Sequence, residues 1–144
     1  KELLKYPADT AGGLMTPEFV AVPAGMTAQE AIGYLRRAGE EAETIYYCYV
    51  LDAGNRLIGV FSLRDLIVAP PTRVIDEIMA RDVVSVQPDT SHADTAGLIA
   101  RYNLLAIPVV DEEGRPLGIV TVDDAIDAVL PSRLKKQLPK VFAS

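Results

Sequence analysis

The sequence predicts a mixed α/β (α+β) fold in which two β-α-β-β-α copies pack as a pseudo-twofold pair. Three observations support this prediction. Segments of the first half of the 144-residue chain recur in the second half, short β-branched stretches alternate with helical patterns, and each copy contains one glycine-bearing hairpin turn. Because 49% of the residues are apolar, the chain can bury a sizeable core.

The repeat is visible when two pairs of segments are aligned. Residues 14–37 align with residues 78–101, and residues 49–67 align with residues 108–126. The offset is 64 in the first pair and 59 in the second, so the first copy carries five extra residues. These residues are most simply placed in the stretch AGEEAE, between a helix and a strand, because loops tolerate insertions.

The first copy reads as a strand, a helix, two strands and a second helix. FVAV is a β-branched stretch, and Thr27 followed by Glu30 marks the start of the first helix. IYYCYVLD and LIGVF are predicted strands joined by the turn AGNR. The second helix starts near Leu63, and it is ended by Pro70 and Pro71.

The second copy repeats this order. VVSV is its predicted first strand, Ser91 with Asp94 marks the next helix start, and the strands LLAIPVVD and PLGIV flank the turn EEGR before the final helix. We therefore expect five regions: a lead-in at 1–13, the first copy at 14–70, a linker at 71–77, the second copy at 78–130 and a C-terminal tail at 131–144.

The predicted tail is basic, with Arg133, Lys135, Lys136 and Lys140. It reads either as a segment that approaches an anionic membrane face or as an ordinary solvated helix end. No apolar run approaches the roughly 18 residues that a membrane-spanning helix needs. The chain begins without a methionine, which suggests a fragment of a longer protein.

Composition and residue usage disfavour several classes of function. The net charge of −6, from 20 acidic and 14 basic residues, disfavours a general nucleic-acid binder. The single cysteine, Cys48, excludes an intramolecular disulfide, indicates a reducing compartment and lies in an apolar run typical of a buried strand. The single histidine, His92, has no obvious nucleophilic partner and is predicted to be a solvated polar residue, so we do not expect an enzyme.

The pattern Gly-x-x-Ser/Thr-x-x-Asp occurs once in each copy, where a strand runs into a helix. Ser62 and Thr121 are predicted N-caps, and Asp65 and Asp124 fall at the third helical position. Each aspartate is explained either as half of a capping box or as a ligand-binding group. In the second reading, the two corners face one cleft in which backbone N–H groups and a carboxylate bind a nucleotide.

The second corner adds an acidic cluster. Asp127 lies three and four residues after Asp124 and Asp123, so the three carboxylates neighbour one another on a helix. Clustered carboxylates suit a hard cation such as Mg²⁺ or Ca²⁺, and we name Asp123, Asp124 and Asp127 as candidate metal ligands. A solvated acidic helix end is an equally good explanation from these residues alone.

The repeated units with GVFSLRD and GIVTVDD resemble a tandem pair of cystathionine-β-synthase (CBS) domains over residues 14–130. The stretches DTAGGLMTPE and ETIYY resemble, more narrowly, the cytosolic CBS pair of MgtE-type magnesium transporters and channels. That resemblance implies a regulatory module on the cytoplasmic face of the membrane, dimerised through its CBS pair and attached to the transmembrane domain of the transporter. It also implies that bound Mg²⁺ keeps the pore shut and that ATP, or another adenine nucleotide such as AMP or ADP, tunes the Mg²⁺ response.

The same resemblance implies a set of nucleotide-binding residues, with Tyr47 against the adenine. The set is Tyr47, Ser62, Arg64, Asp65, Leu104, Pro108, Thr121 and Asp124. Leu104 stands where the family has an aromatic residue, which weakens stacking on the base. Ala93 and Asn103 replace acidic residues of the family, so part of a metal site is missing.

Two alternatives remain open from the sequence. The chain is either a CBS pair of another transporter or enzyme that binds an adenine nucleotide without sensing metal, or a purely structural dimerisation module whose corners are only capping boxes. Titration with Mg²⁺ and with nucleotide separates these alternatives from the Mg²⁺ sensor.

Overall fold

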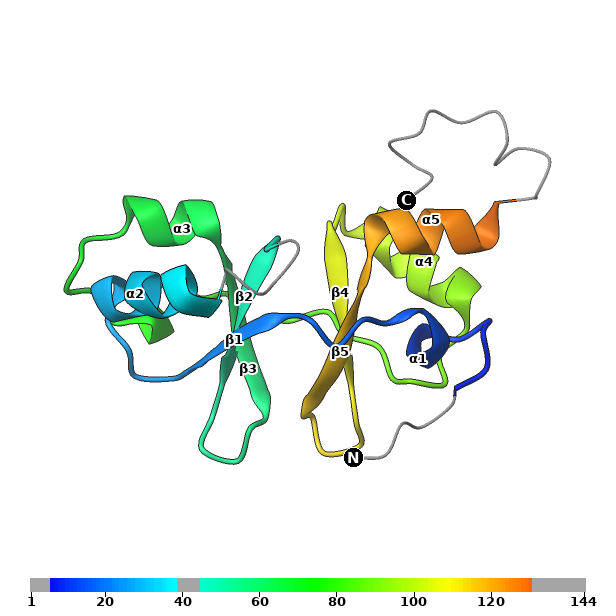
Figure 1. Cartoon of the computed structure of the whole chain (residues 1–144), viewed down its shortest axis with the longest axis horizontal. Coiled ribbons are helices and arrows are strands. Elements are labelled where there is room, and N and C mark those ends of the chain that lie inside the picture. Colours follow the sequence, from blue (N-terminus) through cyan, green and yellow to red (C-terminus); the bar gives the residue numbers. More distant parts are fainter. Residues whose placement is uncertain (1–5, 39–44, 131–144) are drawn as a thin grey trace. The chain divides into compact units, whose positions relative to one another are not determined.

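The computed structural model describes residues 6–38 and 45–130, so the predicted basic tail and most of the AGEEAE insertion lie outside the described residues. Contacts divide the chain into two compact units. Unit 1 comprises residues 1–16, 84–111 and 117–144, and unit 2 comprises residues 17–83 and 112–116. Helices and small sheets occur in both units, which confirms the mixed α/β class (Figure 1).

Unit 2 is a three-stranded sheet with two helices on one face (Figure 1). Its elements are β1 (Val20–Pro23), α2 (Ala28–Ala38), β2 (Tyr47–Leu51), β3 (Leu57–Ser62), α3 (Leu63–Val68) and the short 3₁₀ helix η1 (Ile75–Glu77). The central strand β2 runs parallel to β1 and antiparallel to β3. Cys48 and Val50 of β2 join Ala31, Leu35 and Leu66 from the helices in one buried cluster.

The described residues of unit 1 form a two-stranded sheet and three helices. Its elements are α1 (Ala11–Leu14), α4 (His92–Arg101), β4 (Ala106–Val110), β5 (Pro116–Thr121) and α5 (Val122–Val129). Its core is made by Ile99 of α4, Ile107 and Val109 of β4, Val120 of β5 and Ala125 of α5. The lead-in contributes to the same core, because Ala11 is fully buried in it.

The prediction that VVSV forms a strand is wrong. In the described chain it is reduced to one parallel bridge, in which Val86 N donates to Pro108 O at 3.0 Å and Val110 N donates to Val86 O at 2.8 Å. The next hydrogen bond of a parallel ladder would need the N–H of Pro108 on one side or of Pro88 on the other. Proline has no N–H, so the ladder stops after one rung.

The first residues of each sequence copy pair with the sheet of the other copy. Thr16 pairs with Ile119 of β5 in unit 1, and the equivalent Ala80 pairs with Val60 of β3 in unit 2. The bond from Thr16 N to Ile119 O is 2.8 Å, and that from Val60 N to Ala80 O is 3.0 Å. The compact units therefore do not coincide with the copies seen in the sequence.

The segment expected to be a linker, 71–77, contains structured residues. Ile75 at the start of η1 is fully buried in the core of unit 2, and its N–H donates to Met26 O at 2.8 Å. Asp76 accepts a hydrogen bond from Gly25 N at 2.8 Å, which ties η1 to the turn after β1. The second half of the segment is thus part of the packed unit.

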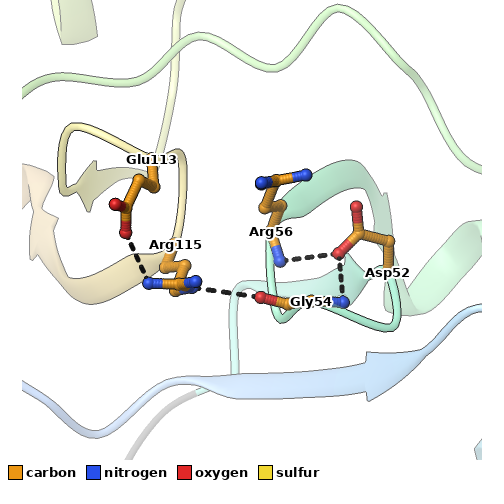
Figure 2. Close-up of polar contacts among 5 residues, drawn as sticks. All are labelled: Asp52, Gly54, Arg56, Glu113 and Arg115. Atoms are coloured by element: carbon orange, nitrogen blue, oxygen red, sulfur yellow. Dashed lines mark hydrogen bonds and ion pairs between the residues drawn. The ribbon is translucent and has the colours of Figure 1, made fainter.

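The two hairpin turns contact each other within unit 2 (Figure 2). Asp52 Oδ1 accepts from Gly54 N and Arg56 N, each at 2.9 Å, in the turn between β2 and β3. The tip of the second hairpin belongs to unit 2 as well: Arg115 Nε donates to Gly54 O at 3.1 Å, and Glu113 is ion-paired with Arg115. The two turns are therefore joined at their tips within unit 2.

The buried thiol of Cys48 predicts a loss of stability in alkali. Burial raises the pKa of Cys48 from 9.0 to about 12. Between these values the thiol ionises in the unfolded chain and stays protonated in the folded one, so the free energy of unfolding falls as pH rises from 9 towards 12. Urea unfolding across this range measures the slope, and the Cys48→Ala variant should lack the part of the slope that Cys48 contributes.

Candidate functional site

The first strand-to-helix corner, in unit 2, brings four predicted site residues together. The β2–β3 register places Tyr47 directly opposite Ser62, the N-cap of α3, so their Cβ atoms are close neighbours. Arg64 and Asp65 follow in the first turn of α3, and both are exposed. Tyr47 itself is half-buried.

At this corner the capping explanation is confirmed. Ser62 Oγ accepts from Asp65 N at 3.1 Å, and Asp65 Oδ2 accepts from Ser62 N at 3.0 Å. These reciprocal bonds satisfy two N–H groups that the start of a helix leaves without an intrahelical partner. The same reciprocal arrangement joins Thr27 and Glu30 at the approach to α2.

The equivalent corner in unit 1 is only half of a capping box. Thr121 Oγ1 accepts from Asp124 N at 3.3 Å, but in the described chain no return bond joins the Asp124 carboxylate to Thr121 N. Asp124 is half-buried and lines a surface cleft instead. Two aspartates that are equivalent in sequence therefore have different surroundings in the structure.

The cleft at Asp124 has a volume of about 410 Å³ and gathers acidic groups from two distant parts of the chain. Asp124 and Asp127 of α5 line it together with Asp9 of the lead-in and His92 at the start of α4. Asp123, the third predicted metal ligand, is half-buried on the first turn of α5 and is not among the lining residues. Two of the three predicted ligands thus meet, and Asp9 joins them.

His92, predicted to be a solvated polar residue, is partly exposed and also makes contacts within unit 1. His92 is half-buried, its backbone N–H donates to Asp9 O at 2.8 Å, and its ring Nδ1 lies 3.0 Å from the same oxygen. His92 therefore ties the lead-in to the first turn of α4. No local pattern in the sequence predicts this contact, because the two residues are 83 positions apart.

Within the residues that the structure describes, no three His, Cys, Asp or Glu side chains are arranged to hold a metal ion. The cleft supplies carboxylates in a looser arrangement. This suits Mg²⁺, which commonly keeps several water molecules and binds through only one or two protein carboxylates. Zinc would instead need a close set of nitrogen and sulfur ligands.

The other predicted nucleotide residues of unit 1 are packed more deeply. Pro108 is buried in β4, and Leu104 is half-buried against the core of that unit. By the offset of 59, Ala106 stands where a second Tyr47 would be, so the aromatic residue at this position occurs in only one copy. The predicted nucleotide set is divided equally between the two units, and its assembly into one site stays a prediction.

Matched substitutions test the difference between the two corners. Asp65→Ala removes one half of a complete capping box and should lower the free energy of unfolding by about 1 kcal/mol. Asp124→Ala removes no capping bond and should cost less than about 0.5 kcal/mol. Urea denaturation without added metal measures both changes in the free energy of unfolding. If the two variants lost the same stability, the conclusion that the Asp65 carboxylate caps its helix and the Asp124 carboxylate does not would be contradicted.

Comparison with known families identifies the class of protein. The CBS domain matches two stretches of the chain, residues 11–71 and residues 75–131. The chain therefore belongs to the CBS-domain family, as a tandem pair of these domains. No helix in the described part of the chain is long and apolar enough to cross a membrane.

Relatives of high identity include two magnesium transporters. The magnesium transporter MgtE of Thermus thermophilus is 54% identical over 141 residues, which cover 98% of this chain and 31% of that protein. MgtE of Enterococcus faecalis is 47% identical over 129 residues, covering 90% of this chain and 28% of the relative. The chain thus spans about a third of the length of these transporters.

A solved structure of similar sequence confirms the fold. The cytosolic domain of the Mg²⁺ channel MgtE, solved in complex with ATP, is 57% identical with a TM-score of 0.83, and the match covers 86% of this chain and 50% of that one. The present chain is accordingly a CBS pair similar to the cytosolic region of MgtE.

Proposed function

We propose that this chain is the Mg²⁺-sensing regulatory module of an attached magnesium transporter or channel, on the cytoplasmic face of the membrane. The transporter relatives of 54% and 47% identity support the attachment to a magnesium pathway. The observation that carries the metal-sensing part is the cleft in unit 1, where Asp124 and Asp127 lie together with Asp9. A divalent cation bound there lowers the repulsion among these carboxylates.

The physical mechanism is a shift between two populations. When Mg²⁺ is scarce, repulsion among the carboxylates of the cleft favours a looser arrangement of the module. When Mg²⁺ is abundant, it binds the compact arrangement preferentially and stabilises it in proportion to its differential affinity. The attached pore is open in the first state and shut in the second.

Calorimetric titration with MgCl₂ tests the metal proposal. Asp124→Asn and Asp127→Asn should each weaken Mg²⁺ binding about tenfold or more, and Asp82→Asn, an exposed aspartate outside the cleft, should not. Titration with NaCl at matched ionic strength separates binding from screening. An Mg²⁺ isotherm that neither cleft variant changes would contradict the assignment of the metal to this cleft.

We also propose that the module binds an adenine nucleotide, most readily ATP, with Tyr47 stacked on the base. The related cytosolic domain solved with ATP supports this proposal. The position of Tyr47 opposite the N-cap of α3, with Arg64 in the first turn of that helix, supports it as well. Aromatic side chains stack on bases, and an arginine beside a helix start favours phosphate.

Titration with ATP and with AMP tests this second part. Tyr47→Ala should lower the affinity about tenfold, because stacking on a base contributes about 1–3 kcal/mol. Tyr102→Ala serves as the control, since Tyr102 is an exposed tyrosine of unit 1. Nucleotide binding without Mg²⁺ binding would favour a CBS pair that senses nucleotide alone. If the protein bound neither ligand, a structural dimerisation module would be favoured.

The proposal includes a homodimer formed through the CBS pair. Leu63, Ile67 and Val68 of α3 are exposed by 38%, 72% and 70%, and Val129 of α5 by 42%. Leu63 and Ile67 are four residues apart, so they share one face of the helix. Sedimentation equilibrium should give a dimer for the wild type and a weaker dimer for Ile67→Glu, whose charge would be desolvated in an apolar interface.

A further inference from the structure

Tyr49 is the most deeply buried aromatic residue of unit 2, and it lies outside that unit's hydrophobic core. It sits in the middle of β2, paired with Ala21 of β1 and Val60 of β3. Its neighbours Cys48 and Val50 belong to the core beneath α2 and α3. Since side chains alternate across a strand, Tyr49 points to the opposite face of the sheet, where it is only 2% exposed.

The hydroxyl of Tyr49 is buried and makes no hydrogen bond with the described part of the chain. A buried polar group without a partner opposes folding, so phenylalanine at this position would pack as well or better. The ring of Tyr49, in contrast, has an aromatic neighbour on each of two sides.

That ring is the middle member of an aromatic row. The Phe19 ring lies on one side at a centroid distance of 6.2 Å and an interplanar angle of 81°. The Tyr47 ring lies at 6.4 Å and 66°, also edge to face. Both distances fall in the range in which edge-to-face pairs attract. Tyr49 thus links a half-buried ring near β1 to the ring that the proposed function assigns to the base.

We propose that Tyr49 is a positioning residue of the nucleotide site, whose ring holds Tyr47 in the orientation in which Tyr47 stacks on a base. This inference rests on the proposed function, which assigns the stacking role to Tyr47. A half-buried aromatic side chain at the start of a strand keeps some rotamer freedom, and losing that freedom when a ligand binds weakens binding. A neighbouring ring that fixes it beforehand removes most of this cost.

The test compares two substitutions at one position. Tyr49→Leu removes the ring and should weaken ATP binding about fivefold. Tyr49→Phe keeps the ring and should bind ATP within about twofold of the wild type, with an unchanged or higher melting temperature. Should Tyr49→Leu fail to fold, Tyr49→Met, whose flexible side chain fills irregular space, takes its place. Affinities are measured by calorimetry at one fixed Mg²⁺ concentration.

A second readout is independent of nucleotide. The chain has 6 tyrosines, 3 phenylalanines and no tryptophan, so the aromatic NMR resonances of Tyr47 can be assigned. In the ligand-free protein, the ring at position 49 should displace the chemical shifts of Tyr47 in the wild type and in Tyr49→Phe. In Tyr49→Leu, these chemical shifts should move towards the values of a freely rotating tyrosine side chain. This measurement tests the positioning of Tyr47 whether or not a nucleotide binds.

The outcomes separate the inference from the proposed function. Absence of ATP binding by the wild type would overturn the nucleotide part of the proposed function, and the NMR comparison would still decide whether Tyr49 orders Tyr47. Wild-type binding with an unaffected Tyr49→Leu variant would overturn the inference alone. An equal loss in Tyr49→Phe would overturn it as well, because the hydroxyl rather than the ring would then be responsible.

Discussion

Replacement of Gly118 by alanine should lower the free energy of unfolding by about 3 kcal/mol, at the upper end of the cost of overpacking a core. A Cβ atom at this position would lie 2.6 Å from Thr16 O and 3.0 Å from Met15 Sδ. The Thr16 carbonyl cannot move freely, because it accepts the hydrogen bond from Ile119 N at 2.9 Å. The substitution therefore forces the segment around Met15 and Thr16 away from β5.

The equivalent glycine provides a matched comparison. At Gly59 the added Cβ would approach Met79 Sδ and Cγ at 2.2 and 2.7 Å, which are atoms of a flexible side chain rather than of the backbone. Met79 can adopt another rotamer, so Gly59→Ala should cost only about 1 kcal/mol. Gly33→Ala, which meets nothing within 4 Å in α2, should instead stabilise the protein by up to about 1 kcal/mol.

Guanidinium chloride denaturation of the three variants measures these differences. The ranking carries more weight than the absolute values, since contacts around each glycine relax to different extents. If Gly118→Ala and Gly59→Ala lost the same stability, then the Thr16 carbonyl would not be the obstacle, and the pairing of Thr16 with β5 would be looser than the structure indicates.

The internal repeat made much of the fold predictable, because its signals are local. The cap residues Ser62 and Thr121 and the helix stop before Pro70 depend on neighbours within a few positions, and the structure confirms them. The pairing of Thr16 with Ile119 could not be predicted in the same way. The first residues of each copy show the same local pattern whether they pair with their own copy or with the other, and only tertiary packing decides between these arrangements.

The candidate site was predictable to a smaller extent, for a related reason. Asp65 and Asp124 occupy the same place in the repeated pattern, so sequence alone explains both in the same two ways. The structure distinguishes them, because Asp65 returns a bond to its N-cap and Asp124 lines a cleft with Asp9. Asp9 lies in the lead-in, far from Asp124 in sequence, and nothing near it in the chain marks it as a neighbour of that aspartate.

Leu66→Ala should lower the free energy of unfolding by about 3 kcal/mol, the usual cost of deleting a fully buried leucine side chain. Leu66 is 1% exposed and anchors α3 to the core of unit 2, where it packs with Phe61 and Ile75. Because α3 begins at the Ser62 corner, loosening this helix should also weaken nucleotide binding at Tyr47 and Arg64. Denaturation and ATP titration of the same variant measure both effects.

Ile67→Ala is the matched control, since it removes a similar side chain from the next position of the same helix. Ile67 is 72% exposed, so the loss of stability should be within about 0.5 kcal/mol for the monomer. If a second copy covers this face, however, the wild-type melting temperature rises with protein concentration. In Ile67→Ala, the melting temperature should depend less on concentration. In Leu66→Ala, it should be lower at every concentration. A concentration-independent melting temperature in the wild type would contradict the proposed dimer and would leave the core assignment of Leu66 intact.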